Sequence, residues 1–135
     1  MLGAIPIPQE RKAIPLFCSA VETRATEAHC ISIFPEAHMW NYCTFVRPFH
    51  FGSFRYPVSY EKPVVAVAVT YQQRRIPFLR HPRRTVFISD PIYPDKTLSP
   101  KEAQRKLSNE VEAFINEKVS RYSTYKYYDY IKTES

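Results

Sequence analysis

Residues 63–70 read PVVAVAVT, an apolar run without a charged side chain. Successive side chains of a strand point to opposite faces, so Val65, Val67 and Val69 share one face and the two alanines share the other. A run that is apolar on both faces is typical of a central strand in a parallel sheet. Because alanine is small, we expect a helix to lie close against the alanine face.

The sequence before this run predicts one strand–helix–strand unit. Residues 3–7 and 30–34 are short and apolar, and Pro35 ends the second of these runs because proline cannot donate to a central ladder. Between them, apolar residues recur at steps of three and four, which predicts an amphipathic helix: Ile14, Phe17, Cys18, Val21, Ala25 and Ala28. This order is that of a βαβ unit.

The sequence after the run predicts another strand and a long helix. Residues 85–89 predict another strand, ended by Asp90 and Pro91. Ser99, Pro100 and Glu102 have the order of an N-cap, a first-turn proline and a capping-box acid. Apolar residues then follow at helical spacing: Ala103, Leu107, Val111, Phe114 and Ile115. Residues 37–60 show no period and predict a long loop with one short helix. We therefore expect an α/β fold with a mostly parallel sheet flanked by helices.

Composition narrows the class of protein. A chain of 135 residues, 44% hydrophobic and 24% charged, fits one globular domain. Gly3 and Gly52 are its only glycines, which excludes glycine-rich phosphate loops. Three cysteines form no C-x-x-C pair, so reduced thiols are expected. No signal peptide and no apolar run of about 18 residues is present, which predicts a cytoplasmic protein, with a peripheral position on the inner face of the membrane left open.

Positive charge is concentrated in one segment. The net charge is +6, and the segment 72–84 contributes five arginines and no acid: Arg74, Arg75, Arg80, Arg83 and Arg84. The segment is either a solvated loop or a surface attracted to an anionic membrane or to the phosphates of coenzyme A. A nucleic-acid partner ranks lower, because the tyrosines cluster in the tail away from the arginines and no RNA-binding motif is found.

Residues 33–38, IFPEAH, place a lone carboxylate after an apolar run. Ligands bind outside the carboxyl ends of strands in open α/β sheets, so Glu36 is a candidate ligand-binding residue. An exposed glutamate or a helix cap is the simpler alternative. His38 is either structural or turned to the ligand. A metal site is not expected, because the spacing of the nearby donors matches no zinc pattern: His29, Cys30, His38 and Cys43.

Four blocks together carry a family resemblance. They are GAIPIP (residues 3–8), FPEA (34–37), RPFHFGSF (47–54) and PVVAVA (63–68). In order and approximate spacing they resemble the second motif, the Phe-Pro-Glu-Gly motif, the Phe-Lys-x-Gly-small segment and the fourth motif of the glycerophospholipid acyltransferase family. That family includes 1-acylglycerol-3-phosphate acyltransferase. The resemblance covers roughly residues 2–118.

The resemblance implies acyl transfer from acyl-CoA or acyl carrier protein to a lysophospholipid hydroxyl, without a cofactor or metal. It assigns Glu36 and Arg47 to the phosphate and glycerol region of the acceptor, although a structural salt bridge of Arg47 is an equal alternative. Gln9 stands where the second motif commonly ends in arginine, with Arg11 as a substitute. The adjoining loop is shaped by His50, Gly52 and Ser53.

The chain departs from the family at its catalytic motif, a histidine followed five positions later by an aspartate. Five positions after its four histidines stand Phe34, Cys43, Arg55 and Val86. Two milder departures are Ala37 for glycine and Ala66 for proline. The resemblance therefore implies an N-terminally truncated, partial acyltransferase domain over residues 1–119, with no catalytic residue, and a Tyr/Lys-rich tail over residues 120–135. The alternative is a non-catalytic, degenerate module that binds anionic lipid surfaces, or a truncated product that folds poorly.

Overall fold

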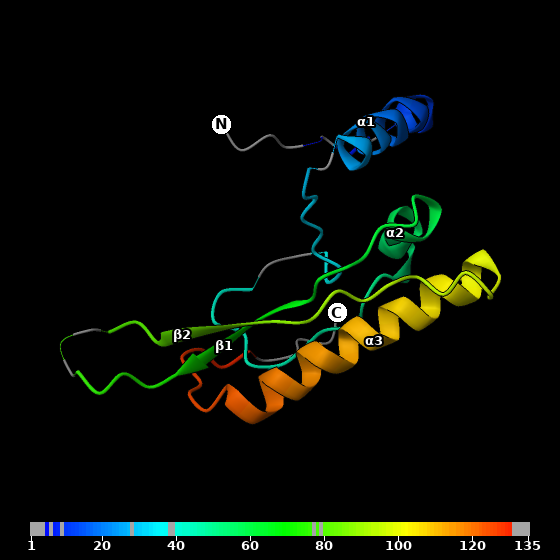
Figure 1. The fold of residues 1–135 in the computed structure, drawn as a ribbon. Coiled ribbons are helices and arrows are strands. Elements are labelled where there is room, and N and C mark those ends of the chain that lie inside the picture. The colour runs from blue at the N-terminus through cyan, green and yellow to red at the C-terminus, as the bar shows by residue number, and fades with distance from the viewer. Residues whose placement is uncertain are drawn as a thin grey trace.

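A two-stranded hairpin and one long helix form the centre of the molecule (Figure 1). The computed structural model describes residues 5, 7–8, 10–27, 29–37, 40–76, 78 and 80–130. In these residues the elements follow in the order η1 (Arg11–Ala13), α1 (Ile14–Thr26), η2 (Phe51–Phe54), α2 (Arg55–Ser59), β1 (Val67–Gln72), β2 (Arg83–Ile88) and α3 (Pro100–Tyr122).

The predicted mostly parallel sheet is wrong, because β1 and β2 pair antiparallel, from Val67 opposite Ile88 to Gln72 opposite Arg83. The connection between them, residues 73–82, is shorter than the dozen or so residues that a parallel crossover needs, and none of its described residues is helical. An isolated antiparallel bridge between Val64 and Ile92 continues the pairing beyond the ladder.

The predicted βαβ unit is also absent from the described residues. Residues 29–34 follow α1 as an extended segment that belongs to no strand, and their apolar side chains are exposed. Of the expected first strand, only Ile5 and Ile7 lie within the described residues, and neither is in a strand. Without a partner for residues 30–34, apolar composition alone does not produce a ladder, since a strand is stabilised by its neighbours.

The two faces of β1 have different environments. Ala66, Ala68 and Thr70 are buried against α3, as expected for the alanine face, and Ala66 packs with Leu107 and Val111. Val67 on the other face is 52% exposed, and its neighbours Val65 and Val69 are exposed as well. The small side chains allow the helix backbone to approach the sheet, so the smaller apolar residues are the buried ones.

Helix α3 begins where the sequence predicted. The backbone N–H of Ser99 donates to Glu102 Oε2 at 3.2 Å, and the Ser99 hydroxyl donates to the same oxygen at 2.5 Å. These hydrogen bonds lower the pKa of Glu102 below its usual value, the hydroxyl having the larger effect. The capping box is therefore confirmed. The helix continues to Tyr122, past the expected start of the tail at residue 120.

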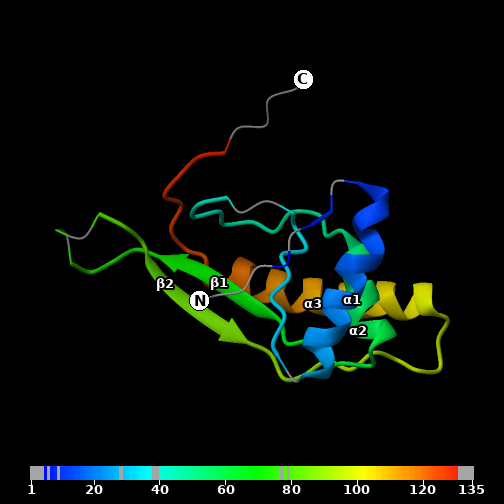
Figure 2. The same ribbon diagram turned by 90° about the horizontal axis from the view of Figure 1, so that it is seen from above.

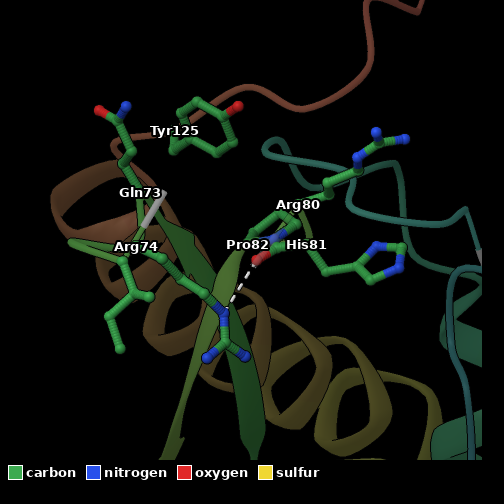
Figure 3. Close-up of a pocket in the computed structure, with 7 residues that line it drawn as sticks. Gln73, Arg74, Arg80, His81, Pro82 and Tyr125 are labelled. Carbon is green, nitrogen blue, oxygen red and sulfur yellow. Dashed lines mark hydrogen bonds between the residues drawn. The ribbon is translucent and has the colours of Figure 1, made fainter. Parts of the chain in front are cut away.

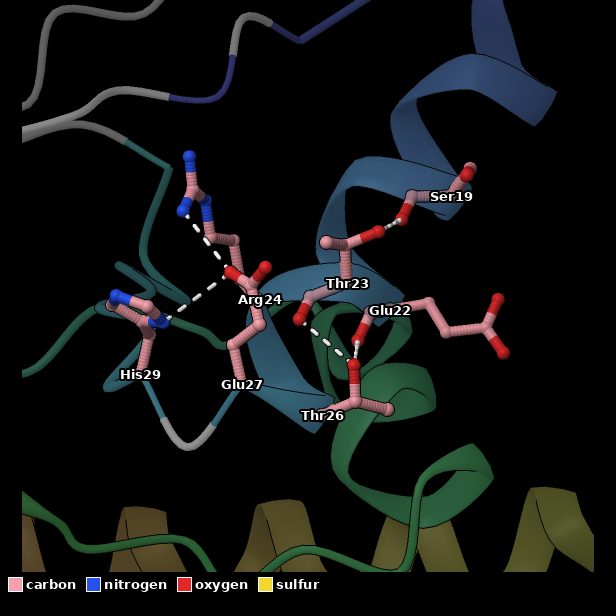
Figure 4. Close-up of polar contacts among 7 residues, drawn as sticks. All are labelled: Ser19, Glu22, Thr23, Arg24, Thr26, Glu27 and His29. Atoms are coloured by element: carbon pink, nitrogen blue, oxygen red, sulfur yellow. Dashed lines mark hydrogen bonds and ion pairs between the residues drawn. The ribbon is translucent and has the colours of Figure 1, made fainter.

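Helix α1 is confirmed near its predicted position, and it packs on α2 through the edge-to-face rings of Phe17 and Tyr56. Val21 is its one buried residue within the described chain. Its last turn is closed by local polar contacts, including Thr23 Oγ1 to the Ser19 carbonyl at 2.9 Å and the Arg24–Glu27 ion pair at 3.2 Å (Figure 4). No helix in the described part of the chain combines the length and hydropathy needed to cross a bilayer.

Candidate functional site

The Phe-Pro-Glu segment forms a tight turn after the extended residues 29–34. The backbone N–H of Ala37 donates to the Phe34 carbonyl at 3.1 Å. Ala37 has a φ of 64°, in the left-handed region where glycine is the usual residue. The alanine is thus at a position whose backbone conformation favours the glycine of the family's motif.

This turn is joined to the segment 47–54, eleven residues further on. Both the backbone N–H and the side-chain Nε–H of Arg47 donate to Glu36 Oε2, each at 3.2 Å. The His50 backbone N–H donates to the Pro35 carbonyl at 2.9 Å. Glu36 and Arg47 side chains are 31% and 14% exposed, so water only partly screens their ion pair. Two blocks that are separate in the sequence form one unit.

Aromatic rings support the Arg47 side chain. Its Cζ lies 4.6 Å from the centre of the Trp40 ring, within the range of a cation–π contact. Trp40 is stacked on Tyr130 of the C-terminal tail with ring centres 4.8 Å apart, and Phe45 meets both rings edge-on. Tyr130 also donates a hydrogen bond to the Asn41 carbonyl at 2.5 Å. The tail thereby holds the loop that supports Arg47.

The remaining predicted residues of this loop have structural contacts of their own. Ser53 lies within the short helix η2, and its hydroxyl donates to the His50 carbonyl at 2.9 Å. The His50 residue is exposed. At Gly52 a Cβ would meet open space, and the backbone has no positive φ. Neither packing nor backbone conformation therefore requires a glycine at Gly52.

Arg11 is not joined to this group. It is exposed in η1, and no hydrogen bond or ion pair within the described chain links it to Glu36 or Arg47. Gln9, His38 and half of the first block, residues 3–8, lie outside the described residues, so their predicted roles stay predictions. The structure thus brings together Glu36, Arg47, His50 and Ser53, and it does not bring Arg11 to them.

The geometry determines what chemistry the group can perform. Of the two alternatives for Arg47, the salt bridge is present, and a phosphate contact would add to it. The Glu36 carboxylate offsets the charge of Arg47, so this group would bind an anion through directed hydrogen bonds and not through net charge. In the described residues no three His, Cys, Asp or Glu side chains are grouped so that they could hold a metal ion.

A second aromatic group was missed from the sequence. Tyr42 contacts Tyr71, Tyr127 and Tyr128, and its hydroxyl lies 3.2 Å from His81 Nδ1. Arg84 lies over the Tyr42 ring at 5.8 Å. The expected separation of tyrosines and arginines is therefore wrong in space, because the tail returns along the hairpin and its residues 124 and 125 donate to the Tyr71 carbonyl. The only indication of this contact in the sequence was the abundance of aromatic residues in both the loop 37–60 and the tail 120–135.

Comparison with known proteins provides no relative for this arrangement. No family model, no curated protein and no solved structure matches the chain.

Proposed function

We propose that this chain is the acceptor-binding portion of a lysophospholipid acyltransferase, and that by itself it binds a 1-acylglycerol-3-phosphate without transferring an acyl group. The observation that carries the proposal is the double hydrogen bond from Arg47 to Glu36 Oε2. It joins the two blocks that the family resemblance assigns to the acceptor. The left-handed backbone of Ala37, where the family motif has glycine, gives further support.

The roles of the residues follow from their chemistry. The Glu36 carboxylate fixes the guanidinium of Arg47, and a guanidinium matches the oxygens of a phosphate in paired hydrogen bonds. Trp40 limits the movement of the guanidinium from its other side. His50 stands at the same turn, where its exposed imidazole contributes a further donor.

Turnover is not expected of this chain. In the proposed reaction the substrate hydroxyl attacks the thioester carbon of the donor, its proton passes to a base, and the thiolate of the donor leaves. A histidine oriented by an aspartate is the base in the resembled family, and none of the four histidines has an acid five positions later. Glu36 is engaged with Arg47, so it is assigned to binding and not to proton removal.

The test is a binding titration with a short-chain lysophosphatidic acid that stays monomeric, against the matching monoacylglycerol without phosphate. We expect the phosphate to increase the affinity, and Glu36→Gln to reduce it about tenfold, because Arg47 is then no longer held in place for its charge-assisted hydrogen bonds to the phosphate, which contribute roughly 1.5–3 kcal/mol. Glu110→Gln, an exposed carboxylate on α3, is the matched control and should bind as the wild type does. Circular dichroism verifies the fold of each variant.

Two results would contradict the proposal. Equal affinity for the two lipids would show that the chain has no site for the acceptor phosphate, and would favour the non-catalytic, degenerate module. Acyl transfer from labelled acyl-CoA that Glu36→Gln abolishes would show that the chain is catalytically complete.

A further inference from the structure

The connection between β1 and β2 extends away from the helices and exposes apolar side chains at its end. Figures 1 and 2 both show this connection at the end of the molecule opposite α1 and α2. Phe78 is 92% exposed and Ile76 is 56% exposed. Together these two exposed side chains form a small apolar surface that a partner can cover.

Positive charge surrounds these two residues. All five arginines of the segment are exposed, and none of them is in an ion pair recorded for the described chain. Residues 73–89 include no acidic residue, so the segment attracts anions without internal compensation.

The arginines do not converge on one point. A surface pocket of about 170 Å³ lies at the base of the connection, with Arg74, Arg80, His81 and Tyr125 in its lining. Figure 3 shows the guanidinium groups of Arg74 and Arg80 pointing in different directions, with Arg74 Nε donating to the His81 carbonyl at 2.9 Å. Diverging guanidinium groups match many phosphates spread over a surface better than the phosphate of one small molecule.

We propose that the β1–β2 connection docks on an anionic lipid bilayer, with Phe78 and Ile76 entering the interface and the arginines contacting the headgroup phosphates. Exposed apolar side chains, here Ile76 and Phe78, and nearby basic residues, here the arginines, are the two features that together anchor a protein segment at a membrane surface. The isoleucine favours a bilayer over nucleic acid as the partner, because bases stack on aromatic rings and an aliphatic side chain offers no such plane. The inference uses no residue of the Glu36–Arg47 pair.

Vesicle flotation of the full chain tests the two parts of the surface separately. We expect binding to phosphatidylcholine vesicles containing phosphatidylserine and little binding to phosphatidylcholine alone. A triple variant R74Q/R75Q/R80Q should bind about 100-fold more weakly at low salt, since each basic residue contributes about fivefold. K62Q/K101Q, two exposed lysines elsewhere, is the charge control and should lose much less.

Phe78→Ala should weaken binding about tenfold at low and high salt alike, because apolar burial is not screened by ions. Tyr93→Ala removes another well-exposed aromatic side chain, on the segment before α3, and should bind as the wild type does. A Phe78→Trp probe reports insertion directly when it is placed in a Trp40→Phe background, since Trp40 is the only tryptophan. Its emission should shift to the blue on phosphatidylserine vesicles.

Several results would overturn the inference. One is equal binding to both vesicle types. Another is a loss of binding in the control variants as large as that in R74Q/R75Q/R80Q and Phe78→Ala. A third is a tryptophan emission that does not shift on phosphatidylserine vesicles. Binding to single-stranded RNA in place of vesicles, with the same variants impaired, would replace the bilayer by nucleic acid. The vesicles contain no lysophospholipid and Glu36→Gln should bind them normally, so this test fails or succeeds independently of the acceptor site.

Discussion

The unit of β1, β2 and α3 and the loop of residues 29–50 are stabilised in different ways. In the first, Ala66, Leu107 and Val111 form an apolar core with Phe54. In the second, most large apolar side chains are exposed, and the loop is held by the Glu36–Arg47 pair, the His50–Pro35 hydrogen bond and stacked rings. Nonspecific burial thus stabilises one region, and individual directional contacts stabilise the other.

The largest effect is expected from Leu107→Ala. Leu107 is among the largest fully buried side chains, so its removal leaves a cavity between α3 and the hairpin and should cost about 2–5 kcal/mol of the free energy of unfolding. Urea unfolding followed by circular dichroism measures it. Val67→Thr, on the exposed face of β1, should change stability by less than about 0.5 kcal/mol. Similar losses of stability in Leu107→Ala and Val67→Thr would show that the valine face of β1 is buried as well.

Tyr130→Ala tests the loop region. It removes the ring stacked on Trp40 and the hydrogen bond to Asn41, and aromatic pairs contribute about 0.5–1.5 kcal/mol beyond area burial. We expect the free energy of unfolding to fall by about 1 kcal/mol and the intensity of Trp40 fluorescence to change. Tyr93→Ala, an exposed tyrosine away from this group, is the control. An unchanged Trp40 emission in Tyr130→Ala would contradict the stacking.

A gain in stability is expected from Ala37→Gly. A left-handed alanine costs about 1–2 kcal/mol, and the added freedom of glycine in the unfolded chain offsets roughly 0.4–1 kcal/mol of the relief. The net stabilisation should be about 0.5 kcal/mol by thermal melting. The same change at Ala113, exposed on α3, should instead destabilise by about 1 kcal/mol. If both Ala37→Gly and Ala113→Gly lowered the stability, the backbone at Ala37 would not be strained.

The smallest effect concerns the exposed Asp95–Lys106 ion pair, 2.7 Å long. The hydrogen bond from Lys106, and then those from Thr97, hold the pKa of Asp95 well below its usual 3.8. A lowered folded-state pKa contributes stability above the unfolded pKa, and this contribution is lost as the pH falls through the folded value. The melting temperature of Asp95→Asn should therefore lie below that of the wild type near neutral pH.

The pH profile decides this last prediction. The difference between the two melting temperatures should shrink as the pH falls from about 4 toward 2. A constant difference over this range would show that the ion pair does not act through ionisation. Lys106→Gln should give a smaller difference of the same kind, because it removes the hydrogen bond from Lys106 and leaves those from Thr97.

The sequence predicted those parts of the fold that depend on local pattern. Ser99 and Glu102 lie three residues apart, so the N-terminal cap of α3 could be recognised without any distant contact. The alternation in residues 63–70 likewise predicted which face meets a helix. The direction of strand pairing depends on residues 73–82. Their length and their lack of a helical pattern favour a hairpin, which the prediction of a parallel sheet did not take into account.

The sequence indicated residues of the candidate site, whose binding role stays a prediction, and did not indicate how they contact one another. Glu36, Arg47 and His50 were identified by resemblance, and the structure places them at one turn. Trp40 and Tyr130 were missed because their contact joins segments 90 positions apart, and nothing in either local sequence specifies the other. Arg11 was included on motif position alone, and it lies apart from the pair.

By itself, the sequence determined α1, α3, the alternating faces of β1 and the concentration of arginine between the strands. These features depend on the 3.6- and 2-residue periods and on charge, which act between near neighbours. Tertiary structure decided the antiparallel pairing, the exposure of the valine face of β1, the Arg47–Trp40–Tyr130 stack and the exposure of Phe78. Each of these depends on which distant surfaces meet, and that is determined by the packing of the whole chain.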